Sequence, residues 1–223
     1  GCGILSSALC MDKDMAHRLV QLAGIRTPDS VVLHSQLPDA ELREQTSGLP
    51  YPVFVKPVNS GSSFGITSVS DADELSDAVK KAFQHDGKVV VEEAVPGFEV
   101  GCAVLGTDPL TFGEVDEIEL SRGFFDYTEK YTLKTSKIHM PARIDADTAK
   151  RVKQAAAVVY GTLGCSGFAR VDFFLTPQKE IVFNEVNTIP GFTTHSRYPS
   201  MLKGIGITFE QMVDEMIRLA VES

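Results

Sequence analysis

Residues 167–174 read GFARVDFF, and residues 183–199 read FNEVNTIPGFTTHSRYP. Their runs of Val, Phe and Ile are typical of buried strands and predict one strand at 167–175 and another at 180–187. The polar stretch at 176–179 contains a proline and predicts the turn between them. Two strands this close in sequence are expected to pair side by side.

Polar side chains interrupt these apolar strands at regular spacing. Side chains alternate in direction along a strand, so Arg170 and Asp172 would share a face, and so would Glu185 and Asn187. If the strands pair, three oxygen-bearing side chains and one guanidinium meet on one patch. Carboxylate and amide oxygens suit Mg²⁺, which also keeps waters and substrate phosphates. The alternative is a solvated sheet face with an Arg–Asp ion pair.

The metal interpretation is favoured because both strands lack lysine and their acids lie between Val and Phe. Further strands are expected at 52–57, 66–69, 88–93, 99–105 and 112–120. Helices are expected at 12–23 and 145–163, capped by Asp12 and Asp145, and from Asp71 and Thr208, each with a Glu or Gln three residues on. Hairpin-like strand pairs beside helical crossovers predict an α+β fold rather than a doubly wound parallel sheet.

Residues 121–136, SRGFFDYTEKYTLKTS, follow neither period and predict a long loop, a feature that often carries function. The 223 residues carry 30 acidic and 21 basic side chains, a net charge of −9. Such a surface argues against a nucleic-acid binder or an anionic-membrane binder. No apolar stretch approaches a membrane span, and four scattered cysteines indicate reduced thiols in a cytoplasmic protein.

Two further features are weak singly and stronger together. Lys56 ends an apolar strand, where a lysine usually only extends toward solvent. The loop GSSFG at 61–65 follows, and glycines let backbone N–H groups approach an anion, although such loops are more often plain turns. Upstream of a magnesium site, the pair predicts a cradle for a nucleotide polyphosphate. Glu92, Glu93 and Glu99 could accept hydrogen bonds from adenine or ribose, or could simply be surface acids.

Five motifs occur in a fixed order: VKPVNSGSSFGI, EEAVPGFEV, FFDYTEKY, GFARVDFF and FNEVNTIPGFTTHSRYP. In this combination they resemble the D-alanine–D-alanine ligases of the ATP-grasp superfamily over essentially the whole chain. The chain is most similar to the vancomycin-resistance branch that makes D-alanyl-D-serine. The resemblance implies two α+β lobes enclosing a nucleotide, here at 1–91 and 92–223, and a mobile loop at 121–136. It also implies ATP and two Mg²⁺ ions, with Mn²⁺ as a substitute.

The resemblance assigns nucleotide contacts and catalytic groups by position. For ATP these are the phosphate-binding Lys13 and Lys56, the phosphate-covering Ser62 and Ser63, the adenine and ribose contacts Glu92, Glu93, Val95 and Glu99, and Lys130 of the mobile loop. For catalysis they are Arg170 and the backbone of Gly191, which match the groups that stabilise the tetrahedral intermediate, and Lys130, Tyr131 and its partner Ser62. The Mg²⁺ ligands match Asp172, Glu185 and Asn187, and the second-substrate pocket matches Ser196 and Arg197.

The implied reaction belongs to peptidoglycan precursor synthesis. ATP phosphorylates the carboxylate of one D-alanine, and the amine of a second D-amino acid displaces the phosphate. Ordinary D-alanine–D-alanine ligases usually carry an apolar residue where this chain has Arg197, whose guanidinium could hydrogen-bond a D-serine hydroxyl. We therefore expect D-serine to be preferred as the second substrate, with residual D-alanyl-D-alanine activity. The alternative is that Arg197 turns to solvent or pairs with an acid. Tyr131 argues against a D-lactate product, because the D-lactate branch departs from tyrosine there.

Full-length relatives carry a further N-terminal domain that nothing in this chain matches, and residues 1–12 are expected to be the segment that joins it. We therefore expect this chain to bind Mg-ATP weakly and not to ligate. A homodimer is expected for the full-length protein. The alternatives are an ordinary D-alanine–D-alanine ligase, another ATP-grasp carboxylate–amine ligase, and an ATP-binding module that has lost transfer chemistry.

Overall fold

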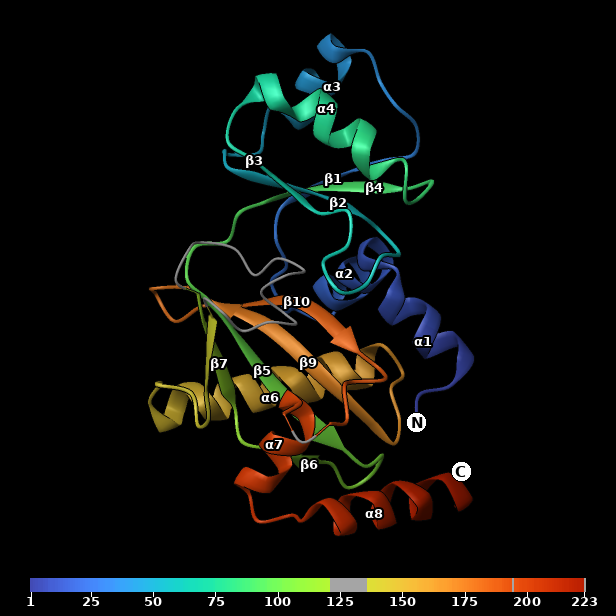
Figure 1. Cartoon of the computed structure of the whole chain (residues 1–223), viewed down its shortest axis with the longest axis vertical. Helices are drawn as coiled ribbons and strands as arrows, with labels where there is room; N and C mark the ends of the chain where they lie inside the picture. The colour runs from blue at the N-terminus through green and yellow to red at the C-terminus, as the bar shows by residue number, and fades with distance from the viewer. Residues whose placement is uncertain (121–135, 194, 223) are drawn as a thin grey trace.

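Two antiparallel sheets carry the fold, in a computed structural model that describes residues 1–120, 136–193 and 195–222. The first sheet lies above the second along the long axis of the molecule (Figure 1). Its strand order is β1-β4-β2-β3. These strands are β1 (Ser30–Leu33), β2 (Val53–Pro57), β3 (Thr67–Val69) and β4 (Val89–Glu93).

Two helices, α3 (Asp39–Thr46) and α4 (Ala72–Ala82), cover the first sheet. Helix α4 buries Leu75 and Val79, at helical spacing, against Val55 and Val91 of the central strands. This small core is separate from that of the second sheet.

The second sheet has the order β10-β9-β5-β7-β8, with β6 paired to β5. Its strands are β5 (Phe98–Leu105), β6 (Thr111–Phe112), β7 (Asp116–Leu120), β8 (Ser136–His139), β9 (Phe168–Leu175) and β10 (Ile181–Asn187). Its helices are α1 (Ile4–Met11), α2 (Lys13–Leu22), α6 (Ala146–Thr162), α7 (Arg197–Gly204) and α8 (Phe209–Val221). Helices α1, α2 and α6 contribute to one core cluster, and α7 and α8 to another.

Strand β5 is the centre of this sheet, and its two faces differ. Val100, Cys102 and Val104 belong to the core shared with α6, whereas Ala103 and Leu105 pack with α7 and α8. Strand alternation therefore assigns Glu99 and Gly101 to the same face as Ala103. That face carries the candidate site.

Strand β10 contains one extra residue, a β-bulge at Asn184. Phe183 pairs with Phe173, but the next pair is Glu185 with Asp172, so Asn184 has no partner across the ladder. The bulge lets Phe183 and Val186 both enter the core while Glu185 points to the opposite face. Without it, strict alternation would place Phe183 and Glu185 on one side.

The α+β class is confirmed, and so are most predicted elements. The predicted caps accept backbone hydrogen bonds as expected: Asp12 from Met15, Asp71 from Asp73, Asp145 from Thr148, and Thr208 from Gln211 in a full capping box. The single strand predicted at 112–120 is wrong, because Gly113 leaves β6 and the chain re-enters the sheet as β7.

Other elements escaped prediction. Residues 1–12 were expected to be a joining segment, but they contain α1, which starts after Gly3 without a side-chain cap. Helix α7 contains Pro199, which is tolerated because it lies in the first turn. The predicted loop lies outside the described residues, except that Ser136 begins β8.

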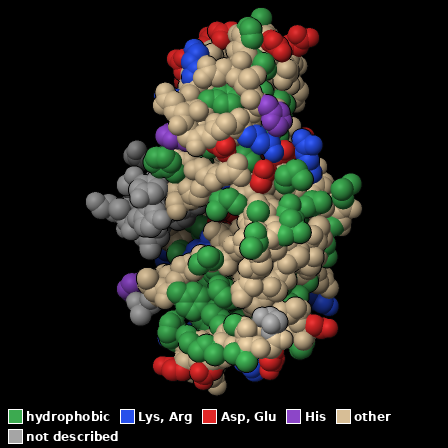
Figure 2. Space-filling model, turned by 90° about the vertical axis from the view of Figure 1, so that its right-hand side faces the viewer, with side chains coloured by type: hydrophobic (Ala, Val, Ile, Leu, Met, Phe, Trp, Pro, Cys, Tyr) green, Lys and Arg blue, Asp and Glu red, His purple; other side chains and the backbone are tan. Residues whose placement is uncertain are grey.

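The division expected near residue 91 stays a prediction. In the structure, β4 of the first sheet extends to Glu93, and α1 and α2 share the core of the second sheet. On the face that carries these helices, Figure 2 shows many hydrophobic side chains at the surface. Ile4 and Leu5 of α1 are 94% and 74% exposed. No helix in the described part of the chain is long and apolar enough to cross a membrane.

The capping box gives a direct test of the last helix. Thr208→Ala removes the side chain that accepts from Gln211 N, and it should lower the free energy of unfolding by about 1 kcal/mol. Urea denaturation measures the loss. Gln211→Ala, which removes the reciprocal bond to Thr208 N, should lower it less. An unchanged midpoint for Thr208→Ala would show that α8 does not depend on its cap.

Candidate functional site

One row of residues crosses four neighbouring strands of the second sheet. Asp116 of β7 lies opposite Gly101 of β5, Gly101 lies opposite Asp172 of β9, and Asp172 lies opposite Glu185 of β10. Residues directly opposite each other share a face, so three carboxylates point the same way with a glycine between two of them. The predicted convergence of Asp172 with Glu185 is confirmed, and Asp116 is an addition that sequence reasoning missed.

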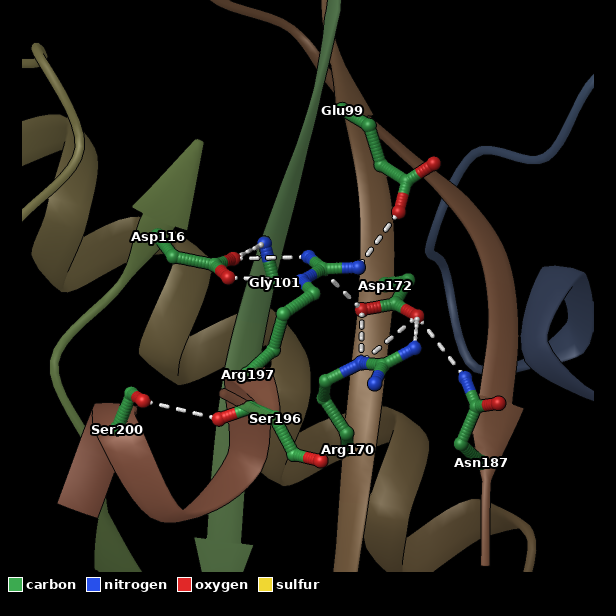
Figure 3. Close-up of polar contacts among 9 residues, drawn as sticks. All are labelled: Glu99, Gly101, Asp116, Arg170, Asp172, Asn187, Ser196, Arg197 and Ser200. Carbon is green, nitrogen blue, oxygen red and sulfur yellow. Dashed lines mark hydrogen bonds and ion pairs between the residues drawn. The ribbon is translucent and has the colours of Figure 1, made fainter. Parts of the chain in front are cut away.

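The side chain of Arg197 occupies the space above Gly101 (Figure 3). Its Nε donates to Asp116 Oδ2 at 2.7 Å, its Nη2 to Asp116 Oδ1 at 2.8 Å, and its Nη1 to Glu99 Oε1 at 2.9 Å. Nη2 also lies 3.4 Å from Asp172 Oδ1. The sequence left open whether Arg197 would turn to solvent or pair with an acid. The structure shows that it pairs with acids.

Only glycine fits beneath this guanidinium. A Cβ at Gly101 would overlap Arg197 Nη2 and would lie 2.8 Å from both Asp116 Oδ1 and Asp172 Oδ1. The Gly101 N–H also donates to Asp116 Oδ1 at 3.0 Å, which fixes that carboxylate. A glycine inside a strand often marks such a close approach, and this signal was present in the sequence.

The charges of this cluster are largely out of water. Asp116 and Asp172 are 0% and 1% exposed, and the Arg197 side chain is 9% exposed. Burial alone would lower the pKa of Arg197, but Asp116 and Asp172 outweigh it and raise that pKa well above its usual value. The guanidinium is therefore a fixed positive charge.

A second guanidinium holds the other side of Asp172. Arg170 Nε lies 2.8 and 3.0 Å from the two carboxylate oxygens, and Nη2 donates to Oδ2 at 2.7 Å. Asn187, opposite Arg170 in the ladder, donates from Nδ2 to the same Oδ2 at 2.9 Å. The Arg–Asp ion pair expected for a solvated sheet face is therefore present, but it belongs to a larger and largely buried cluster.

The residues expected to hold Mg²⁺ fit that ion by donor type. Asp172, Glu185 and Asn187 offer hard oxygen ligands from paired strands, and the amide oxygen of Asn187 is left over when Nδ2 donates. Among the described residues, no group of three or more His, Cys, Asp or Glu could hold a metal ion. Glu99, Asp116, Asp172 and Glu185 bring four carboxylates to this face, beside the guanidiniums of Arg170 and Arg197.

Residues expected near the nucleotide form a second buried group. Lys56 of β2 donates to Glu92 Oε2 of β4, and these residues are 7% and 1% exposed. Burial would raise the pKa of Glu92, but the charge of Lys56 outweighs it and lowers that pKa below its usual value. Glu92 Oε1 is buried without a hydrogen-bond partner among the described residues. A ligand that donates a hydrogen there would satisfy it.

The loop after β2 contains two residues with left-handed backbone. Ser62 and Ser63 have φ angles of 52° and 57°, in the left-handed region that residues other than glycine seldom adopt. Such conformations cluster at functional sites. Lys13 at the start of α2 donates to Ser60 O at 2.6 Å, which ties this predicted phosphate lysine to the loop.

The remaining predicted residues fall into three groups. Glu93 pairs with Arg26 at 3.2 Å and accepts from Asp29 N, so its carboxylate is used within the protein, and Val95 is half-buried just beyond β4. Gly191 and Ser196 lie together, since a Cβ on the glycine would sit 2.9 Å from Ser196 Oγ. Lys130 and Tyr131 lie outside the described residues.

Comparisons with known proteins identify the family. The family described as "D-ala D-ala ligase C-terminus" matches residues 19–218. The vancomycin B-type resistance protein VanB of Enterococcus faecalis is 48% identical over all of this chain and 65% of its own length. A D-alanine–D-alanine ligase of Caldicellulosiruptor bescii is 43% identical over all of this chain and 62% of its own length.

A solved structure extends the likeness to three dimensions. The crystal structure of the VanG D-Ala:D-Ser ligase from Enterococcus faecalis matches 98% of this chain and 64% of that chain, with a TM-score of 0.90 and 64% identity. The ATP-grasp fold implied by the sequence motifs is confirmed. The chain spans just under two thirds of the length of these relatives. By sequence and by structure, it belongs to the D-alanine–D-alanine ligase family, whose C-terminal part it matches.

Proposed function

We propose that this chain is the ATP-binding part of a D-alanine–D-amino acid ligase that makes D-alanyl-D-serine through a D-alanyl phosphate. The observation that carries the proposal is the row of Asp116, Asp172 and Glu185 with Arg197 seated over Gly101. This row supports the proposal because it gathers oxygen ligands suited to a cation and a buried guanidinium on one sheet face.

The nucleotide would lie between the two sheets. Lys13, Lys56 and the left-handed backbone at Ser62 and Ser63 would hold its phosphates. The orphan oxygen of Glu92 would accept from the adenine amino group, since it is buried and lacks a donor. Glu99, which accepts from Arg197 Nη1, would contact the ribose.

Asp172, Glu185 and Asn187 would hold Mg²⁺, with Mn²⁺ as a substitute and two ions as the full complement. The bound metal neutralises charge on the transferring phosphoryl group. The chain's own residues then stabilise the adduct of amine and acyl phosphate. Arg170, held against Asp172, would face the oxyanion of the tetrahedral intermediate together with the backbone N–H of Gly191.

The second amino acid would lie against the start of α7. Ser196 and the first N–H groups of that helix suit its carboxylate, because helix N-termini favour anions. Arg197 and Asp116 would then offer a donor and an acceptor to a serine hydroxyl. A methyl group in that place would make no hydrogen bond with them, and a site that hydrogen-bonds a hydroxyl discriminates on that basis.

Magnesium-dependent nucleotide binding tests the site in this chain. By isothermal titration with Mg-ATP, the wild-type chain should bind, and Asp172→Ala should weaken binding by about tenfold or more, because it removes a ligand and leaves Arg170 unpaired. Asp77→Ala, at a carboxylate 79% exposed, is the control and should bind as wild type does. Equal affinity for all three proteins would contradict the metal assignment.

Substrate choice can be tested in the full-length enzyme. Arg197→Leu should reduce kcat/KM for D-serine by about 10–100-fold while D-alanine is still used, because the hydroxyl loses its partner. Gly101→Ala should act in the same direction by displacing the guanidinium. Gly161→Ala, where a Cβ meets nothing within 4 Å, is the matched control. Synthesis of D-alanyl-D-alanine alone by the wild-type enzyme would indicate an ordinary D-alanine–D-alanine ligase instead.

The chain by itself should release no phosphate with D-alanine and D-serine. About a third of the length of its relatives is not matched by this chain, and the groups that hold the first D-alanine are expected in that part. A phosphate-release assay with Mg-ATP and both amino acids checks this. Dipeptide formed by the chain alone would contradict it.

A further inference from the structure

His17 of α2 lies where the two buried groups of the site meet. It is 5% exposed, and its ring stands edge-on to Phe183 of β10, with centroids 5.4 Å apart. One ring nitrogen faces the second sheet and the other faces Glu92 of the first sheet. His17 thus lies between Glu92, the acid expected to contact the nucleotide, and β10, the strand that carries Glu185.

The contact with β10 falls on the bulge residue itself. His17 Nε2 lies 2.7 Å from the backbone oxygen of Asn184, the one residue of the strand without a partner across the ladder. A carbonyl oxygen can only accept, so Nε2 must carry the hydrogen. The imidazole therefore donates a hydrogen bond to the backbone of the bulge residue.

This tautomer leaves the other nitrogen as an acceptor. Nδ1 lies 4.0 Å from Glu92 Oε1, so two lone pairs face each other across that gap. Burial lowers the pKa of His17 and outweighs the opposite effect of Glu92, which keeps the ring neutral at pH 7. Lys56 and Lys13 are the cations that face it, and both also act to lower its pKa.

The position of Glu185 depends on the bulge. With Asn184 as the extra residue, Glu185 lies opposite Asp172 on the site face while Phe183 lies opposite Phe173 in the core. If Asn184 entered the ladder, alternation would move Glu185 to the core face. A bond to the Asn184 carbonyl opposes that slip.

We propose that His17 is a positioning residue for the cation site, which pins the bulge at Asn184 through its Nε2–H and so keeps Glu185 beside Asp172. This inference rests on the proposed function, since it assigns Glu185 to a divalent cation. Groups that orient metal ligands commonly change metal affinity by 10–100-fold when they are lost.

Two substitutions of His17 by amides of different length distinguish this positioning role from simple packing. The amide nitrogen of His17→Gln reaches about as far as imidazole Nε2, whereas that of His17→Asn reaches only as far as Nδ1. In the presence of ADP, Mn²⁺ binding followed by electron paramagnetic resonance should be about tenfold weaker for His17→Asn and close to wild type for His17→Gln. ADP affinity without metal should change less than Mn²⁺ affinity.

Thermal unfolding of each variant is measured alongside, and His34→Gln, at an exposed histidine just after β1, is the control. If Asn and Gln variants bind Mn²⁺ equally, the positioning role is overturned while the proposed function stands. If the wild-type chain binds ADP but the Asp172→Ala variant binds Mn²⁺ as tightly as the wild type, the proposed cation site is wrong. The inference about His17 is then wrong too. A shift in melting temperature without the Asn–Gln difference in Mn²⁺ affinity would show a merely structural histidine.

Discussion

The constraint on which this structure depends is the crowding of like charges across one sheet. Neighbouring strands lie about 4.8 Å apart, so carboxylates at adjacent register positions repel strongly unless positive charge separates them. Here Asp116 and Asp172 are both buried and lie on β7 and β9, the two strands that flank β5, with Gly101 of β5 between them. Arg197 fills that interval and contacts both, and Arg170 neutralises the outer side of Asp172. Removing Arg197 would leave the buried carboxylate of Asp116 without its guanidinium.

Much of the surrounding architecture serves this arrangement. Helix α7 begins at Arg197, so the turn that ends β10 and starts the helix decides where the guanidinium lies. On the far side of the row, the bulge at Asn184 brings Glu185 into line with Asp172. The first sheet contributes a separate buried pair, Lys56 and Glu92, and α2 lies between the two groups. The site is thus assembled from both sheets and from the helices that connect them.

The sequence was a good guide to local features and a poor one to long-range register. Alternation along 167–175 and 180–187 correctly predicted that Asp172, Glu185 and Asn187 converge, because both strands are short and consecutive. The role of Asp116 was not predicted, since its partner Arg197 lies 81 residues away and an acid in a strand has no distinctive pattern. Nor could the bulge be predicted, because an extra residue is a property of two strands together. His17 could not be distinguished from the other scattered histidines, because its partner Asn184 is far from it in the sequence.

The glycine under Arg197 has a consequence for how this protein can vary. Every substitution at Gly101 adds at least a Cβ, and that atom would occupy the space of the guanidinium. While residue 197 is arginine, position 101 therefore has a single permitted occupant. A lineage that replaced Arg197 by an apolar residue would free position 101 to acquire a side chain, and once filled it would block the return of arginine. The two positions are therefore coupled, because a side chain at 101 and an arginine at 197 compete for the same space.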